Sequence, residues 1–178
     1  MYQVIVNPTS SSGKGTEAWN KIKEILDRRH VTYEVHVLRE PGEATDIARK
    51  LTAYCGDTDT VKLLVIGGDG TLNEVLNGIQ DFEHTTLSCI QTGSGNDFAR
   101  NMHLEKDVER AIMHLLTHPE EIDLDYGEVT TNRGDNSESL TTRFLISSGV
   151  GYDANICEEV SRSQLKPVLN KIHLGKIV

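Results

Sequence analysis

One apolar run that ends in a glycine-rich turn constrains the fold of this chain more than any other feature. Residues 61–66 (VKLLVI) are apolar apart from Lys62, which is typical of a strand covered on both faces in a parallel sheet. The turn GGDG follows at residues 67–70. The next apolar residues recur at helical spacing, at Leu72, Val75, Leu76 and Ile79. A buried strand, a glycine turn and a helix in this order predict an α/β unit.

The same alternation of strand and helix runs from the N-terminus to about residue 118. The apolar segments predict strands at residues 3–6, 31–37, 61–66 and 87–91. Helical stripes predict helices from Thr16, as the N-cap, to Arg29, then after Pro41-Gly42, at 72–79 and at 108–115. This order predicts an α/β fold, in which a parallel sheet with right-handed crossovers is flanked by helices.

The pattern changes after Pro119. Residues 122–129 and 143–148 are predicted strands, and a polar, turn-rich stretch at 130–139 joins them. Two strands without a helix between them predict antiparallel pairing. We therefore expect one domain at residues 1–121 and the beginning of a β-rich domain at 122–178.

Composition excludes several classes of protein. The net charge of -9 argues against nucleic-acid binding and against electrostatic adhesion to an anionic membrane. The cysteines are few and scattered, which predicts neither a disulfide framework nor a zinc site, and Cys89 is predicted to be a core residue. Without a signal peptide or a membrane-span pattern, we expect a cytoplasmic protein.

The turn at residues 67–70 has the chemistry of a phosphate site. Glycine allows left-handed backbone conformations and places no Cβ between the N–H groups and a ligand. The helix that follows adds partial positive charge at its N-terminus. Asp69 would repel a phosphate unless a divalent cation lay between them, so we expect Asp69 to act through magnesium.

A second turn follows the next predicted strand. Residues 91–97 (QTGSGND) combine Gly93 and Gly95 with the polar side chains of Ser94, Asn96 and Asp97. The two turns should converge on one crevice, because ligand sites in open α/β sheets lie at the carboxyl ends of the strands. The loop at residues 7–15, which includes Lys14 as a candidate phosphate partner, would form a third wall. The structural alternative is a pair of ordinary βα loops, with Asn96 as a helix cap.

Two other motif matches are incomplete. Residues 13–16 (GKGT) lack the upstream glycine of a Walker P-loop. Residues 149–154 (GVGYDA) match a dinucleotide fingerprint, but they follow an antiparallel pair and do not open a βαβ unit. We interpret the second match as a strand-to-helix turn.

Four segments together resemble the diacylglycerol kinase catalytic family, which includes bacterial lipid kinases and the sphingosine and ceramide kinases. They are NPTSSSGKG at 7–15, GGDGTLNEVLNG at 67–78, GSGNDFAR at 93–100 and IDLDYG at 122–127. The resemblance implies a Rossmann-like domain followed by an antiparallel β-sandwich. It also implies an ATP- and magnesium-dependent kinase of phospholipid biosynthesis that transfers the γ-phosphate to a lipid hydroxyl such as that of diacylglycerol.

Functional residues follow from this resemblance position by position. The nucleotide-binding residues it implies are Asn7, Pro8, Thr9, Gly67, Gly68, Asp69, Gly70, Thr71, Leu72, Asn73, Gly93, Ser94 and Asn96. The acidic positions that anchor water and magnesium, and that we assign as catalytic, are Asp69, Asp97 and Asp123, with Asp125 as the alternative to Asp123.

The sequence departs from the family pattern at Ser94 (usually Thr), at Gln91 (often Pro) and at Leu38 (often a nucleotide-contacting Thr). The family's catalytic base and lipid pocket are expected beyond residue 178, so this stretch alone is expected to be inactive. An NAD kinase-like phosphotransferase and a non-catalytic nucleotide-binding module are the alternatives. The expected partner is a lipid substrate, reached transiently at a membrane surface, and a homodimer is left open.

Overall fold

The computed structural model describes residues 1–53, 60–132, 139–151, 154–156 and 158–159. The chain divides into two compact units, Met1–Ile122 and Asp123–Val178. Each unit is described by itself.

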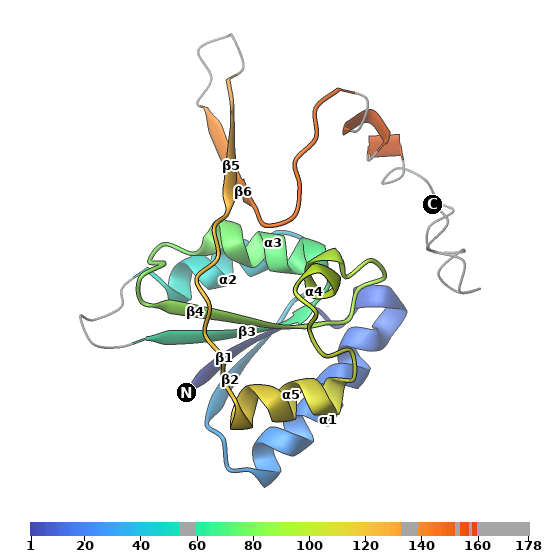
Figure 1. Ribbon diagram of the computed structural model, residues 1–178, viewed down its shortest axis with the longest axis vertical. Coiled ribbons are helices and arrows are strands. Elements are labelled where there is room, and N and C mark those ends of the chain that lie inside the picture. The colour runs from blue at the N-terminus through green and yellow to red at the C-terminus, as the bar shows by residue number, and fades with distance from the viewer. Residues whose placement is uncertain (54–59, 133–138, 152–153, 157, 160–178) are drawn as a thin grey trace. The chain divides into compact units, whose positions relative to one another are not determined.

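A parallel sheet forms the centre of the first unit (Figure 1). Its strands are β1 (Tyr2–Val6), β2 (Tyr33–Val37), β3 (Val61–Gly67) and β4 (Thr85–Gln91). Their order is β2-β1-β3-β4, and every neighbouring pair is parallel. The predicted α/β fold with a parallel sheet is confirmed. Because β2 lies on one side of β1 and β3 on the other, the strand order reverses between β1 and β3.

Helices cover both faces of this sheet (Figure 1). One face carries α1 (Lys14–Arg28) and α5 (Val108–Thr117), and the other carries α2 (Glu43–Leu51) and α3 (Asp69–Gly78). A short 3-10 turn, η1 (Ser10–Gly13), precedes α1, and α4 (Asp97–Asn101) follows β4.

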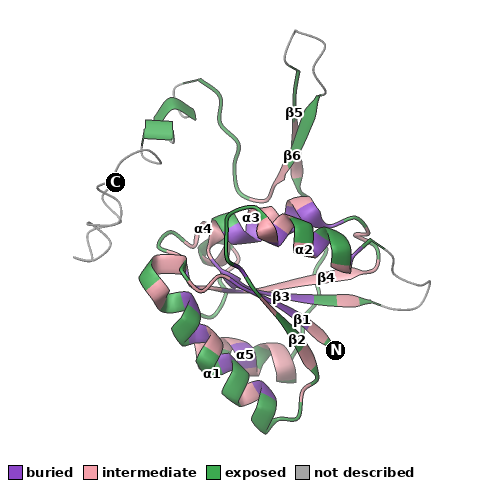
Figure 2. Ribbon diagram, turned by 180° about the vertical axis from the view of Figure 1, so that it is seen from behind, coloured by how far each residue is buried: buried purple, intermediate pink, exposed green. Residues whose placement is uncertain are grey.

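The core fills the space between the central strands and the helices, as the burial colours of Figure 2 show. On the α1 side its buried members are Val4, Val6, Ala18, Ile22, Leu26, Leu64, Ile66, Ile90 and Ile112. Successive strand residues point to opposite faces, so Ile5, Leu63 and Val65 are buried on the α2–α3 side. β1 and β3 are therefore rigid supports for the loops at their ends.

Two details of the first unit differ from expectation. Helix α1 begins at Lys14, and its N-cap is Gly13 with a left-handed φ of 105°. The prediction of Thr16 as N-cap is wrong, because the Thr16 hydroxyl instead donates to the carbonyl oxygen of Pro8 at 3.2 Å. On the edge strand β2, Val35 and Val37 are 39% and 46% exposed, so the apolar face of this strand is only partly covered.

The second unit contains an antiparallel pair, β5 (Gly127–Thr131) and β6 (Leu140–Phe144). Antiparallel pairing is confirmed, but the predicted boundaries are shifted: residues 122–126 lie outside any strand, and β6 ends at Phe144. The ring of Phe144 covers its partner Gly127, where an added Cβ would come within 2.2 Å of the ring. The larger β-sandwich remains a prediction. In the described part of the chain, no helix has the length and apolar character that crossing a membrane requires.

Candidate functional site

The candidate site lies at the carboxyl ends of β1, β3 and β4. The loop at residues 7–13 leaves β1, the turn at 67–70 leaves β3, and residues 92–96 join β4 to α4. The strand order reverses between β1 and β3, and open α/β sheets bind ligands beside such a reversal.

The two glycine turns touch each other through their backbones. A Cβ built on Gly68 would lie 3.1 Å from the Cα of Gly93, and a Cβ on Gly93 would lie 2.8 Å from the Cα of Gly68. Neither position has room for a side chain unless the turns separate. Glycine is therefore required here for close approach between two strand ends.

Left-handed backbone, expected for the glycines of these turns, is not found there. The described glycines with positive φ are Gly13, Gly42 and Gly151, and Gly68 has an extended backbone with φ of -97°. The residue with positive φ within the two turns is Asn96, at 55°. The expectation of left-handed glycine is corrected accordingly.

The first turn of α3 offers a surface of backbone N–H groups. The first N–H groups of a helix have no acceptor inside it, and the helix dipole makes this end partly positive. Gly70 is exposed, and a Cβ there would meet nothing within 4 Å. Gly67 is buried against the Thr71 side chain behind this surface. Leu72 is buried and Asn73 is half-buried further along the helix.

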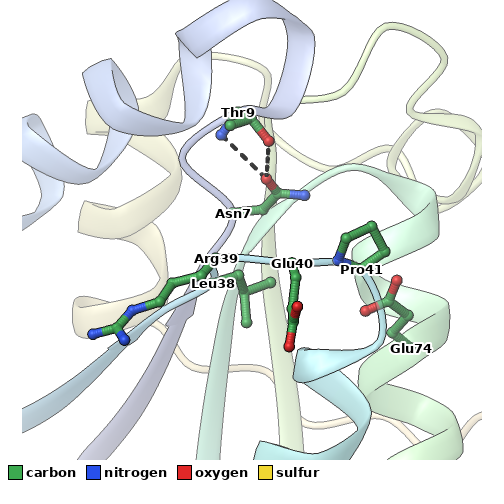
Figure 3. A pocket seen from close by; sticks show the side chains of 7 residues that line it. All are labelled: Asn7, Thr9, Leu38, Arg39, Glu40, Pro41 and Glu74. Atoms are coloured by element: carbon green, nitrogen blue, oxygen red, sulfur yellow. Dashed lines mark hydrogen bonds between the residues drawn. The ribbon is translucent and has the colours of Figure 1, made fainter.

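Side chains bind the N-terminal loop to both glycine turns. Asn7 Nδ2 donates to Thr71 Oγ1 at 2.8 Å. Asn7 Oδ1 accepts from the Thr9 N–H and hydroxyl at 3.2 and 3.0 Å, as Figure 3 shows. The hydroxyls of Ser10 and Thr92 share a hydrogen bond of 2.5 Å. The three loops thus form one connected structure. Thr92 was not anticipated from the sequence, because a hydroxyl within a loop carries no distinguishing pattern.

Asp69 joins the first glycine turn to the start of α4. Its carboxylate accepts from Gln91 Nε2 at 3.0 Å, from the Asp97 N–H at 3.0 Å and from the Phe98 N–H at 3.2 Å. Asn96 occupies the N-cap position of α4, but its side chain makes no capping bond. The cap is therefore supplied by Asp69, so the alternative in which Asn96 caps the helix is wrong.

Asn96 has a different environment. Its Oδ1 is buried against Gly93 and has no hydrogen-bond partner among the described residues. Ser94 and Gly95, beside it, are exposed. The second turn therefore presents a hydroxyl and open backbone at its tip, with an unpaired carbonyl oxygen beneath.

Two carboxylates lie close together near Gly95. A Cβ on Gly95 would be 3.4 Å from Asp69 Oδ2 and 3.8 Å from Asp97 Oδ2. Asp97 also forms an ion pair with Arg100. Within the described residues no group of three or more metal-binding side chains forms. Asp123 and Asp125 are exposed residues of the second unit, so their grouping with Asp69 and Asp97 stays a prediction.

A pocket of about 140 Å³ opens beside the loop after β1 (Figure 3). Its lining residues are Asn7, Thr9, Leu38, Arg39, Glu40, Pro41 and Glu74. Glu74 also accepts from the Gly42 N–H at 3.1 Å, which fixes one wall. Sequence reasoning singled out Asn7, Thr9 and Leu38 and missed the other four, although Pro41-Gly42 marks a turn at the end of a strand.

Cys89 lies in β4, within the sheet that supports the site. Burial, and then the negative charge of Asp69, raises the pKa of its thiol to about 12. The side chain is half-buried in this strand at the edge of the sheet, not in the core as expected. Cys55 and Cys157 lie outside the described residues.

Comparison with known proteins gives a consistent result. The family model of the diacylglycerol kinase catalytic domain matches residues 1–129. The "Putative lipid kinase YtlR" of Bacillus subtilis is 30% identical over 174 residues, which cover 98% of this chain and 55% of the relative. The diacylglycerol kinase of Staphylococcus carnosus is 27% identical over 130 residues, covering 72% of this chain and 41% of the relative.

A solved structure supports the same fold. The crystal structure of a diacylglycerol kinase from Bacillus anthracis matches with a TM-score of 0.59 at 24% identity, and it covers 96% of this chain and 53% of that one. This chain spans about half the length of the curated relatives it matches.

Proposed function

Because this chain belongs to the diacylglycerol kinase catalytic domain family, we propose that it is the nucleotide-binding part of an ATP-dependent lipid kinase. One observation carries the proposal: three loops meet where the strand order reverses, with Gly68 against Gly93. The ligand we propose for this place is ATP or ADP with magnesium.

The nucleotide phosphates are proposed to lie against the first turn of α3. Backbone N–H groups at a helix N-terminus favour anions through hydrogen bonds and partial positive charge. The exposed Gly70 has open space where a Cβ would be, so a phosphate can approach the backbone directly. Ser94 is exposed at the tip of the second turn, and we propose that its hydroxyl donates a further hydrogen bond to the phosphates.

The nucleoside is proposed to occupy the pocket beside Asn7 and Thr9. Glu40 and Glu74 line this pocket and offer carboxylate acceptors for ribose hydroxyls. Leu38 and Pro41 offer apolar surface for a base. Leu38 stands where the family resemblance led us to expect threonine, so a contact at this position would be apolar rather than a hydrogen bond.

Asp69 and Asp97 fit magnesium as partners through water. The Asp69 oxygens already accept three N–H groups and Asp97 is paired with Arg100, but each carboxylate retains free acceptor capacity. Asp69 and Asp97 would hold magnesium through water, and the ion would supply positive charge that offsets the charge developing during transfer. The residues of this chain would contribute by holding the nucleotide and its hydrated ion in a fixed orientation.

A lipid hydroxyl, such as that of diacylglycerol, is the proposed acceptor. The names of the relatives, lipid kinase and diacylglycerol kinase, support this choice. The net charge of -9 disfavours simple electrostatic attachment to an anionic membrane, so we propose that lipid is captured by an apolar groove at the membrane surface.

Nucleotide binding is tested by titration calorimetry of this chain with ATP and ADP, with and without magnesium. We expect binding that strengthens when magnesium is added. A folded chain that binds neither nucleotide contradicts the proposal. Activity is tested on the whole protein, with γ-radiolabelled ATP and a mixed lipid extract, and with NAD as an alternative acceptor. Label in a lipid supports the lipid kinase, label in NAD supports the NAD kinase alternative, and tight binding without transfer supports a non-catalytic module.

A further inference from the structure

We propose that Gln91 is a positioning residue of the nucleotide site, which holds Asp69 and the second glycine turn in the geometry that nucleotide binding requires. This inference rests on the proposed function, because its effect is measured on nucleotide affinity. It concerns a side chain that is expected to touch neither the nucleotide nor the metal.

Gln91 is the last residue of β4 and pairs with Gly67, the last residue of β3. Its carboxamide makes two hydrogen bonds in opposite senses. Nε2 donates to Asp69 Oδ1 at 3.0 Å, and Oε1 accepts from the Ala99 N–H at 3.1 Å. One side chain therefore connects the start of α3 to the first turn of α4. The amide supplies both functions, whereas a carboxylate lacks the donor and an ammonium lacks the acceptor.

The bonds of Gln91 reinforce those that Asp69 itself makes to α4. Asp69 accepts from the Asp97 and Phe98 N–H groups, so the side chains of Asp69 and Gln91 together receive three successive N–H groups of this helix. Both side chains are half-buried. Three donors thereby fix the orientation of the Asp69 carboxylate. Among the described residues, Gln91 is the only one that donates to it from a side chain, and the other two donors are backbone N–H groups.

Loss of the Gln91 hydrogen bonds would change the shape of the surface that is proposed to bind the nucleotide phosphates. The segment that Gln91 and Asp69 anchor begins directly after the second turn, and Gly93 in that turn is in contact with Gly68. A shift of α4 would therefore move one wall of the proposed cradle and turn the Asp69 carboxylate. Small displacements in a site of this kind have large effects, because catalysis and binding depend on pre-set geometry.

The experiment compares two variants of the full chain with one control. Gln91→Met keeps the length of the side chain and removes both hydrogen bonds. Gln91→Glu keeps the acceptor for Ala99 but sets two carboxylates against each other. The control, Thr52→Val, removes a buried hydroxyl at the C-terminal end of α2. This hydroxyl donates to the Ala48 carbonyl oxygen and accepts from the Gln80 N–H.

Thermal unfolding and the affinity for ADP, with and without magnesium, are measured for each protein. Gln91→Met loses a hydrogen bond to a charged group and leaves the Ala99 N–H unpaired, whereas Gln91→Glu sets a second carboxylate against Asp69. We expect each change to weaken ADP binding by about ten-fold or more. Thr52→Val should lower the unfolding temperature comparably and leave ADP affinity unchanged.

The outcomes separate this inference from the proposed function. A wild-type chain that does not bind ADP overturns both. If the wild type binds and Gln91→Met binds within about two-fold of it, the positioning role is wrong and the proposed function stands. Equal losses of affinity in Gln91→Met and Thr52→Val also overturn it, since the effect would then follow stability alone. If Gln91→Met does not fold, a Gln91→Glu protein that binds ADP within about two-fold of the wild type overturns the inference.

Discussion

Asn7 Nδ2 donates a 2.8 Å hydrogen bond to Thr71 Oγ1, across 64 positions of sequence. The bond fastens the loop after β1 to the first turn of α3, and Thr71 is buried where it forms. A further hydroxyl pair, Ser10 with Thr92, fastens the same loop to the turn after β4. The N-terminal loop is therefore an integral part of the site, although its sequence is rich in serine and glycine.

Thr71→Val tests this connection. Valine has nearly the same shape but cannot accept from Asn7, so a half-buried amide loses its partner. We expect the free energy of unfolding to fall by about 1–2 kcal/mol and nucleotide affinity to fall with it. Urea unfolding followed by fluorescence of Trp19 in α1 measures the change, since this is the only tryptophan. Thr117→Val, which removes an exposed hydroxyl bond in α5, is the control and should change stability little. Equal stability of the two variants would contradict the role given to Thr71.

Gly68 and Gly70 form a matched pair for a second prediction. In Gly68→Ala the new methyl group would press on Gly93, so we expect both stability and nucleotide affinity to fall. In Gly70→Ala the methyl group meets open space within a helix, so stability should be unchanged or raised by up to about 1 kcal/mol. If phosphate lies against this turn, Gly70→Ala should still weaken ADP binding. Calorimetry of a stable Gly70→Ala protein with unaltered affinity would place the phosphate elsewhere.

The sequence was sufficient to predict the sheet and the meeting of the two glycine turns at the carboxyl ends of its strands. Apolar periodicity distinguishes strands from helices, and glycine turns at the ends of the strands fix where backbone can approach a ligand. The sequence did not predict the hydrogen bonds made by Asp69 and Gln91. These bonds join two turns that become neighbours only when β3 and β4 pair. The expectation that Asp69 acts through magnesium considered its charge, whereas the structure adds its role as the cap of α4.

Boundaries were misjudged where local pattern and tertiary context differ. Ile122 and Leu124 alternate with acidic residues and so suggested a strand, yet they are exposed and outside β5. Val35 and Val37 are apolar residues of a correctly predicted strand, but β2 is an edge strand and both side chains are exposed. Alternation of apolar and polar residues indicates which side chains can be buried. Whether they are buried depends on the element that packs against them.

A pH prediction follows from Cys89. Burial and the Asp69 charge raise the pKa of its thiol from 9.0 to about 12, so the folded state favours the neutral thiol. The contribution of the neutral thiol to the free energy of unfolding is fully present below the pKa that Cys89 has in the unfolded state. It is lost as pH rises from there towards the pKa of the folded state. Between about pH 9 and about pH 10 we expect the wild type to lose up to about 1 kcal/mol relative to Cys89→Ala. Urea unfolding at several pH values measures this. Parallel pH curves for the two proteins would show that Cys89 ionises equally in both states.

The β5–β6 pair is predicted to open far more readily than the parallel sheet. Its residues are exposed or half-buried, whereas four consecutive residues of β3 are almost completely buried. The side-chain contacts of the pair lie at the surface: the hydroxyls of Thr130 and Thr141 bond at 2.8 Å, and Arg143 Nε donates to Glu128 at 3.2 Å. Exposed polar contacts contribute little, and an isolated two-stranded sheet is only marginally stable.

Hydrogen exchange read by mass spectrometry tests this difference within one molecule. Amides of β5 and β6 should exchange through local opening with a free energy near zero, while those of β1 and β3 should exchange only at a cost close to that of global unfolding. Removing the ion pair with Glu128→Gln should leave β5–β6 exchange almost unchanged, because that pair is partly exposed. Protection in β5–β6 equal to that in β3 would mean that apolar packing, rather than the two-stranded ladder and its surface contacts, holds this hairpin. The exposed Leu140 would then be the first side chain to replace with a polar one.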